Sequence, residues 1–542
     1  MSATISPRIE RLKQRLLAGE LPKPVHSEAF TRAYRQHESG PPLSRLAKAM
    51  REAWLAMPIV VGEDELLVGG NYLQAIAGYH YCGGGLFCDR ALAERLKQTR
   101  DPAAVREMDD VLAYWQDRTT SAVFSRRLAA EGIKLPGCLA WGSAGGCAHL
   151  IPDFAKALML GLKTIKKQLY EKILAAGTDA KKLDFYHAMI TLCDGMMSFA
   201  RRHGQKAAEL AAQCSSAERR AELERIAAIC QAVPSRPALT FHEALQSFWF
   251  VHLLEGVGRY GVMLDSPGRF DQYLYPYYKL SLERGELTRD QAQELVDCFW
   301  LKANEPSVSW NLCIGGQRPT GEDATNEVTY LCLSAAERLR LQKPNLSFRW
   351  HSGTPDSALK RALQVVRLGT GFPAIYNDES LVPALTAIGV TLEDARDYAM
   401  GGCSEVSVSA KSHYGNEDGD ISITKPLEYA LHNGFCVMHK CREGAETGDV
   451  ATFKTFDDVL TAYKRQVEFC IALLARYCNL GQQARAEHAP RLVKTLLTDD
   501  CLERAQTIDA GGARYNGGQF FVIGLANAAD SLAAIKKIVF EE

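Results

Sequence analysis

Residues 344–378, PNLSFRWHSGTPDSALKRALQVVRLGTGFPAIYND, have the pattern of a strand, a helix and a second strand. The runs 344–351 and 372–378 are apolar on both faces, which predicts strands buried on both sides. Between them, residues 357–371 repeat apolar side chains at the three-to-four spacing of a helix. Buried strands separated by helices are typical of an α/β fold in which the helices lie outside the sheet.

The same two patterns continue on both sides of this segment. Further helices are predicted at residues 44–57, 151–177 and 456–478, and further strands at residues 64–70 and 517–527. We find no internal repeat and no low-complexity linker. The chain is therefore expected to form one continuous body.

Composition narrows the class of protein. The 542 residues are 47% apolar, and 63 Lys and Arg nearly balance 64 Asp and Glu. Without a run of like charge, neither nucleic acid nor an anionic membrane is favoured as a partner, and a small-molecule ligand is expected. The N-terminus lacks the apolar core of a signal peptide, and no apolar run approaches the roughly 18 residues of a membrane span. These features predict a cytoplasmic protein.

The sixteen cysteines include no C-x-x-C pair, and most lie in apolar surroundings that are typical of small core residues. Cys403 differs, because it stands between glycines and a glutamate in MGGCSEVSVSAKSH, residues 400–413. We expect a helix from Thr391, its N-cap, to Met400, and then a loop with the thiol at its apex. Cys403 and Glu405 are two positions apart, so on an extended tip both side chains reach one small molecule.

The chemistry of this pair follows from its charges. His413 is available to lower the pKa of a nucleophilic thiol, but the negative charge of Glu405 opposes thiolate formation. A neutral thiol beside a general base is therefore favoured. A conventional cysteine acyl transferase is the alternative, and it requires an accessible thiol of low pKa.

The stretch GVTLEDARDYAMGGCSE resembles the active-site loop of the glycyl radical enzymes, which include pyruvate formate-lyase and the glycerol and propanediol dehydratases. The segments FHEALQSFWFVHLL, SPGRFDQYLYPYY, IGGQRPTGEDATNEVTYL and GGARYNGGQFFVIGLANAADSLAAIKKIVF extend the resemblance over nearly the whole chain. The resemblance implies a ten-stranded α/β barrel with the cysteine loop inside. It also implies a thiyl radical on Cys403, which abstracts hydrogen from the substrate, and Glu405 as general base.

Four further residues are candidates for the substrate pocket by the same resemblance. His149 either lines the pocket or is a histidine at a helix entry bonded to backbone. Asp265 stands where dehydratases carry a His-Ser pair and either replaces it or is a turn residue. Glu417 and Asp418, in NEDGD, either contact substrate or belong to a surface turn. A single Ser404 follows Cys403 where pyruvate formate-lyase has a second cysteine, so acyl transfer from pyruvate is not expected.

The family motif R-V-x-G-Y, whose glycine stores the radical, does not occur in the sequence. We therefore expect one pyruvate formate-lyase-like domain over residues 1–542 without a glycine radical domain. Its expected parts are a helical start to about residue 60, a first half-barrel over about 61–390, and the cysteine loop with the start of a second half-barrel over 391–542.

The absence of the R-V-x-G-Y motif predicts which partners the chain needs and leaves two functions open. In the first, the chain is the large part of a glycyl radical lyase that cleaves C–O, C–N or C–S bonds, with dehydration favoured. It binds no cofactor itself, forms a homo- or hetero-oligomer, and needs a glycyl-radical-bearing polypeptide and a radical S-adenosylmethionine activase. In the second, it is a truncated, non-catalytic relative that acts as a scaffold or binding protein.

Overall fold

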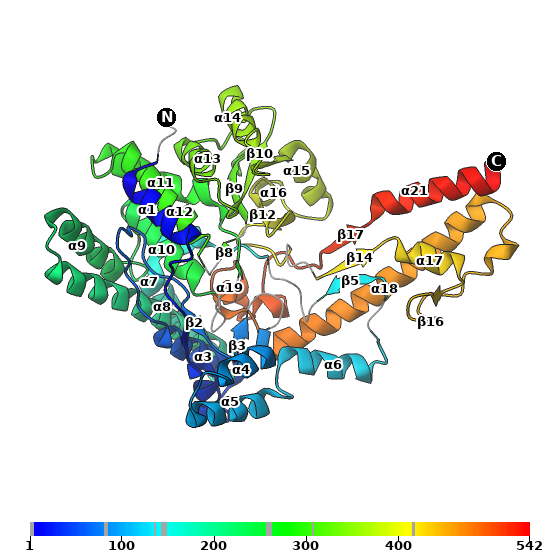
Figure 1. The fold of residues 1–542 in the computed structure, drawn as a ribbon, viewed down its shortest axis with the longest axis horizontal. Helices are drawn as coiled ribbons and strands as arrows, with labels where there is room; N and C mark the ends of the chain where they lie inside the picture. Colours follow the sequence, from blue (N-terminus) through cyan, green and yellow to red (C-terminus); the bar gives the residue numbers. More distant parts are fainter. Residues whose placement is uncertain are drawn as a thin grey trace.

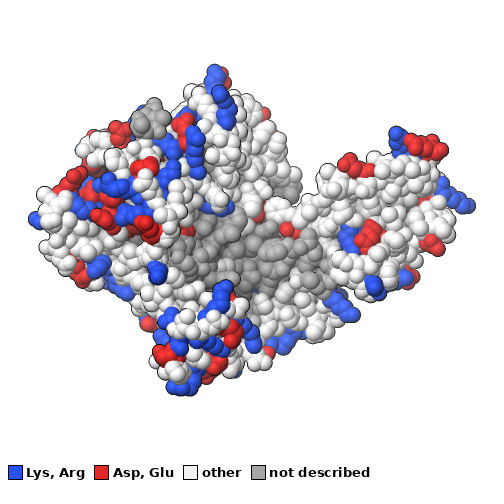
Figure 2. All heavy atoms as spheres, in the orientation of Figure 1, with Lys and Arg blue, Asp and Glu red and all other residues white. Residues whose placement is uncertain are grey.

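The computed structural model describes residues 5–80, 85–134, 137–142, 149–255, 263–305, 308–309, 311–414 and 418–542. Figure 1 shows a helical body, a lobe built on a parallel sheet, and an arm that ends at the C-terminus. On the face shown in Figure 2, positive and negative side chains are interspersed over the body. In the part of the chain that the structure describes, no helix combines the length and apolar character needed to cross a bilayer.

Helices from the first half of the chain make up the body. Side chains cap several of their N-termini, as when Ser6 begins α1 and Thr240 begins α10 by accepting hydrogen bonds from the first turn. The long helix α8 packs against α3, α7 and α9. The helices of this part are α1 (Pro7–Leu17), α2 (Ala29–Gln36), α3 (Pro42–Ala56), α4 (Arg90–Lys97), α5 (Pro102–Trp115), α6 (Thr120–Ala130), α7 (Phe154–Ala176), α8 (Ala180–Gln213), α9 (Ala217–Ala232) and α10 (Phe241–Leu253).

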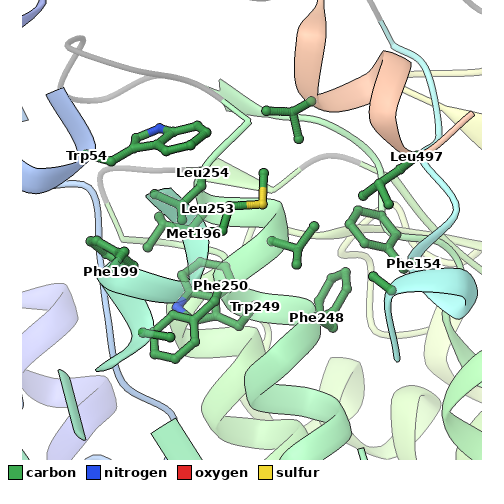
Figure 3. Packing of buried hydrophobic residues seen from close by; sticks show 14 of the residues in the cluster. Trp54, Phe154, Met196, Phe199, Phe248, Trp249, Phe250, Leu253, Leu254 and Leu497 are labelled. Carbon is green, nitrogen blue, oxygen red and sulfur yellow. The ribbon is translucent and has the colours of Figure 1, made fainter. Parts of the chain in front are cut away.

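The centre of the body is helix α10, which is surrounded on all sides. Its residues Phe248, Trp249 and Phe250 are fully buried, and Figure 3 shows them packed among side chains that include Trp54 and Phe154. Burying a large apolar side chain contributes about 1.5–3 kcal/mol.

The predicted strand at residues 64–70 is wrong. The segment begins in a turn and a bend, and its buried residues 67–70 pair with no strand in the described part of the chain, because side chains of α10 satisfy their backbone. The amide of Gln246 both accepts from Val68 N (2.9 Å) and donates to Val68 O (3.0 Å), and the Trp249 indole donates to Gly69 O (2.9 Å). A buried backbone group needs a partner, but that partner need not be a strand.

A four-stranded parallel sheet forms the lobe, in the order β11-β10-β9-β7. It contains the predicted strand–helix–strand unit, because β10 pairs with β11 from Ser347–Ala374 to Trp350–Asn377. The α/β fold class is confirmed. The elements are β7 (Gly268–Arg269), α11 (Phe270–Glu283), α12 (Arg289–Lys302), β9 (Asn311–Gly315), α13 (Glu327–Leu339), β10 (Asn345–Trp350), α14 (Asp356–Val366), β11 (Ala374–Asn377) and α15 (Asp378–Ala387).

The arm contains a second, three-stranded sheet with the order β17-β14-β5. Strand β14 runs parallel to β17 and antiparallel to β5. Helix α18 runs along the arm in Figure 1, and α17 packs against it. The elements are β5 (Leu139–Gly142), β14 (Gly419–Ser422), α17 (Lys425–Leu431), β15 (Phe435–Cys436), β16 (Cys441–Arg442), α18 (Phe456–His488), α19 (Leu492–Leu496), α20 (Cys501–Arg504), β17 (Phe520–Ile523) and α21 (Leu525–Ile535).

Three of the shorter strand pairs lie outside these two sheets. They are β1 (Val25–His26) with β2 (Leu73–Gln74), β3 (Ala77–His80) with β4 (Gly85–Cys88), and β6 (Met263–Leu264) with β8 (Val308–Ser309).

Candidate active site

Cys403 lies at the tip of a β-hairpin. Helix α16 (Leu392–Arg396) begins at the predicted cap Thr391 but ends after five residues. Residues Tyr398–Gly401 then form strand β12, which pairs with β13 (Glu405–Val408) so that Gly401 lies opposite Glu405. The expected helix up to Met400 is therefore wrong in its second half. The hairpin presents the thiol, which is exposed, on a tip of three residues.

A buried ion pair anchors the first strand of this hairpin. Arg349 donates to both carboxylate oxygens of Asp378 at 2.8 Å and to the carbonyl oxygen of Tyr398 at 2.7 Å. The Tyr398 ring lies 3.8 Å from the guanidinium, and its hydroxyl donates to Asp378 at 2.8 Å. A bidentate pair of this kind fixes orientation as well as distance. The parallel sheet thus sets the position of β12.

Glu405 is the buried partner of the exposed thiol. Only 1% of the residue is exposed, and its Oε1 lies 2.9 Å from Nδ1 of His149. Its Oε2 accepts a hydrogen bond from the backbone N–H of Ser404 at 2.8 Å. A carboxylate only accepts hydrogen bonds, so Nδ1 of His149 carries the proton in this contact. The site therefore holds a fixed carboxylate two residues from the thiol.

The glycine pair allows His149 to reach Glu405. A Cβ on Gly401 would overlap the carbonyl group of His149, and a Cβ on Gly402 would overlap its imidazole ring. Gly402 also has a φ of +44°, a conformation that glycine adopts at little cost. His149 is buried, and its contact with the Glu405 carboxylate brings these two predicted residues together.

Side chains from distant segments hold the hairpin tip. The Ser266 hydroxyl accepts from Gly402 N at 2.9 Å, and the Asn311 amide donates to Cys403 O at 3.4 Å. Tyr376 on β11 feels the charges of both Glu405 and Cys403, although burial is the main reason that its pKa is raised. The sequence did not predict these roles. Ser266 adjoins the candidate Asp265, and Tyr376 lies in a predicted strand, which are the only signals available.

Lys343 brings positive charge to the neighbourhood of the thiol. Burial lowers its pKa, and a negative charge on the Cys403 sulfur acts in the opposite direction. Its Nζ donates to Asn345 at 3.0 Å, which holds the ammonium near the start of β10. An anionic group bound beside Cys403 would be attracted by this lysine.

Asp265 is fully buried and forms an ion pair with Lys494 on α19. It is therefore not an exposed turn residue, and its charge is already balanced within the protein. His413 is also buried, 3.5 Å from Nη1 of Arg491, which in turn bonds Asp509 at 2.7 Å. Burial lowers the pKa of His413. These contacts place its ring in the network of Arg491.

Asp418 links the sheet of the arm to α18. Its carboxylate accepts from Gln482 at 2.6 Å and from Gln519 N at 2.8 Å, and 1% of the residue is exposed. It also lines a cavity of about 300 Å³ together with His413. A surface turn at Asp418 is therefore wrong. Glu417 lies outside the described residues.

The fold and the hairpin define an α/β protein that presents a thiol beside a buried carboxylate. A sequence model of the family described as Pyruvate formate lyase-like matches residues 3–542. The chain belongs to this family of glycyl radical enzymes, whose members similar to it are lyases and dehydratases.

Three relatives illustrate the similarity. An isethionate sulfite-lyase of Desulfovibrio desulfuricans is 32% identical over 583 residues, which cover 99% of this chain and 70% of the relative. A trans-4-hydroxy-L-proline dehydratase of Clostridioides difficile is 35% identical over 70% of this chain and 50% of the relative. The glycerol-bound B12-independent glycerol dehydratase of Clostridium butyricum superimposes with a TM-score of 0.88 at 32% identity, covering 99% of this chain and 72% of that structure.

Proposed function

We propose that this chain is the thiol-bearing part of a glycyl radical lyase that acts on a small polar substrate. The observation that carries the proposal is the exposed Cys403 at the hairpin tip, two residues from a buried Glu405 held by His149 and Ser404 N. A glycyl radical, when present, would accept the hydrogen atom of the Cys403 thiol and so leave a thiyl radical on this residue.

The residues of this chain then divide the work between hydrogen and proton transfer. Cys403 takes a hydrogen atom from a substrate carbon, becoming a thiol again and leaving a carbon radical. Glu405 accepts the proton of the hydroxyl on that carbon while the leaving group departs from the next carbon, and in dehydration this proton and the departing hydroxide leave as water, which restores the carboxylate. The Cys403 thiol returns the hydrogen atom to the product radical. Dehydration, which breaks a C–O bond, is the favoured reaction, and C–N or C–S cleavage uses the same groups.

Lys343 supports a second candidate within the same class. A lysine near Cys403 suits a substrate that carries an anionic group, such as a sulfonate. The relatives at about 30% identity include isethionate sulfite-lyases, whose name describes C–S cleavage of a hydroxylated sulfonate. A neutral diol makes no use of this charge, so the two substrate classes are distinguishable.

We further propose that the glycyl radical comes from a second polypeptide, installed by a radical S-adenosylmethionine activase. Support comes from β17, which forms one edge of the arm's sheet and exposes Phe520, Val522 and Ile523. An edge strand with exposed apolar side chains favours pairing with another chain.

The decisive experiment combines this chain, a glycyl-radical-bearing chain and an activase without oxygen. A glycyl radical signal in electron paramagnetic resonance is expected, together with turnover of glycerol, 1,2-propanediol, trans-4-hydroxy-L-proline or isethionate. Cys403→Ala is expected to keep the glycyl radical and lose turnover. Lys343→Met is expected to weaken binding of isethionate and leave a diol unaffected if the substrate is a sulfonate.

The non-catalytic alternative makes the opposite prediction. If the activated mixture formed the radical on its partner but turned over none of these substrates, and Cys403→Ala left the cellular role of the chain intact, a scaffold or binding function would replace the proposal.

A further inference from the structure

A second cluster of reactive side chains lies on the β15–β16 hairpin of the arm (Figure 1), which follows α17 and precedes α18 in the chain. The segment Cys436-Val-Met-His439-Lys-Cys441-Arg-Glu443 places two thiols, an imidazole and a carboxylate within eight residues. The thiol at the candidate active site is on a different hairpin. Nothing in the proposed reaction uses the β15–β16 cluster.

The geometry brings Cys436, His439 and Glu443 to one point, and Cys441 contacts Glu443 from outside this group of three. One ligand atom each from Cys436, His439 and Glu443 lies within 4.8 Å of the other two. Nδ1 of His439 is 2.6 Å from Oε1 of Glu443, and Sγ of Cys441 is 3.8 Å from the same oxygen. Cys436 pairs with Cys441 across the hairpin, so both side chains leave the same face.

We propose that Cys436, His439, Cys441 and Glu443 bind one zinc ion or a similar thiophilic divalent cation. Thiolate, imidazole and carboxylate are the ligands that zinc takes in proteins, in a tetrahedral set of four. Bond lengths of about 2.0–2.3 Å place such ligands about 3–4 Å apart. Cys436, His439 and Glu443 therefore need to close by about 1 Å, and the exposed Cys441, which already contacts Glu443, completes the set of four by turning toward them. Binding displaces the thiol protons of Cys436 and Cys441 to solvent and requires no redox change.

Neighbouring groups already orient the proposed ligands. The backbone N–H of His439 donates to Sγ of Cys436 at 3.3 Å, and the Tyr429 hydroxyl donates to Oε2 of Glu443 at 2.7 Å. The second contact leaves Oε1 facing His439. Hydrogen bonds to the far atom of a ligand are typical of metal sites.

The position of the cluster indicates what the ion does. Strands β15 and β16 are two residues each, and a hairpin of this size is marginal without further support. Cys436 and Tyr429 belong to one buried cluster with Cys138 and Cys470. A metal bound at Cys436 therefore clamps the exposed end of the hairpin to the arm.

The test measures metal content and coordination in the full chain, purified under reducing conditions. After removal of metal with a chelator, we expect one equivalent of Zn²⁺ to rebind per chain. Co²⁺ at the same site is expected to show the visible absorption of a tetrahedral ion and thiolate-to-metal charge transfer. His439→Ala and Cys441→Ser are the main variants, because both residues are exposed and their substitution leaves the core intact. Each is expected to abolish the equivalent of metal.

Matched controls separate this site from the other thiols and histidines. Cys214→Ser, Cys403→Ser and His432→Ala are expected to retain the metal, since none of these residues lies in the cluster. Tyr429→Phe removes only the hydrogen bond to Glu443 and is expected to weaken zinc affinity about 10- to 100-fold. The proposal is overturned if Co²⁺ gives no thiolate absorption. It is equally overturned if His439→Ala and Cys441→Ser bind as the parent does, or if a Cys436–Cys441 disulfide forms and the reduced protein takes up no metal.

Discussion

Among the residues that the structure describes, two groups hydrogen-bond the Glu405 carboxylate, one of them His149 at 2.9 Å. His149→Ala removes this partner and is expected to lower kcat/KM of the activated enzyme about 10- to 100-fold, since a hydrogen bond to a charged group contributes about 1.5–3 kcal/mol. His149→Asn places an amide N–H near the lost Nδ1 and is expected to restore part of the activity. His432→Ala, at an exposed histidine, serves as control. Equal activity in the His149→Ala variant would show that Glu405 does not depend on this contact.

Glu28, a buried residue outside the candidate active site, is expected to make the stability of the protein depend on pH. It is 1% exposed, accepts from Ile76 N at 2.7 Å, and burial raises its pKa to about 7. The folded state therefore keeps a proton that the unfolded chain releases above its ordinary pKa of 4.5. The free energy of unfolding should fall as the pH rises through this window, by about 3 kcal/mol for this group.

Glu28→Gln is expected to remove that part of the pH dependence, measured as the urea midpoint across the window. The exposed Glu20→Gln is the control and should follow the parent chain. If the urea midpoint of the parent chain rose with pH over this range, and the Glu28→Gln variant behaved in the same way, the raised pKa of Glu28 would be contradicted.

Single residues also show which contacts of the candidate site can be predicted from the sequence. Cys403 and Glu405 are two residues apart, so the local sequence alone predicts that their side chains lie together. His149 was predicted from the family resemblance, and it contacts Glu405 although the two residues are 256 positions apart in the chain. The partners of Asp265 and Gly402 depend instead on contacts with Lys494 and Ser266 that no local pattern contains. Residues that bond only through the tertiary fold were therefore missed.

At the scale of the element, the hairpin β12–β13 depends on Gly402 more than on any propensity. Gly402→Ala adds a Cβ at a positive φ and against the His149 ring. It is expected to destabilise the protein by about 1–3 kcal/mol and to remove most turnover, because the tip must shift away from His149. Gly369→Ala is the matched control, with a φ of +74° and no atom within 4 Å of the new Cβ. If both variants behaved alike, backbone strain alone would explain the result.

The elements that the sequence predicted correctly carry a strong local pattern. The strands β10 and β11 and the helix α14 between them lie inside residues 344–378, where the apolar period changes twice. Strand β12 was missed because its residues continue the helical pattern of the segment before them. The contacts that hold Tyr398 in this strand come from Arg349 and Asp378, which belong to other segments of the chain. Tertiary contacts of this kind override local propensity.

For the whole molecule, the sequence predicted an α/β body correctly, because alternating strands and helices determine this class locally. The order of the strands in each sheet is harder to predict from the sequence, because paired strands can lie far apart in the chain. Strand β14 pairs with β5, which lies about 280 positions earlier, and with β17, about 100 positions later. These pairings create the arm, and they leave β17 with a neighbour on one side only among the strands that the structure describes.

This edge carries the last prediction. Phe520, Val522 and Ile523 are 37%, 52% and 44% exposed on a strand whose outer backbone groups have no strand to pair with in the described part of the chain. Such an edge favours addition of a further strand, from a partner or from a second copy. The purified chain is therefore expected to self-associate as its concentration rises, measured by sedimentation velocity. Val522→Lys should reduce this association and weaken binding of a glycyl-radical-bearing partner. Val25→Lys, at a similarly exposed valine on β1, should change neither. A parent chain that stays monomeric and binds its partner equally well after Val522→Lys would show that β17 is not the contact.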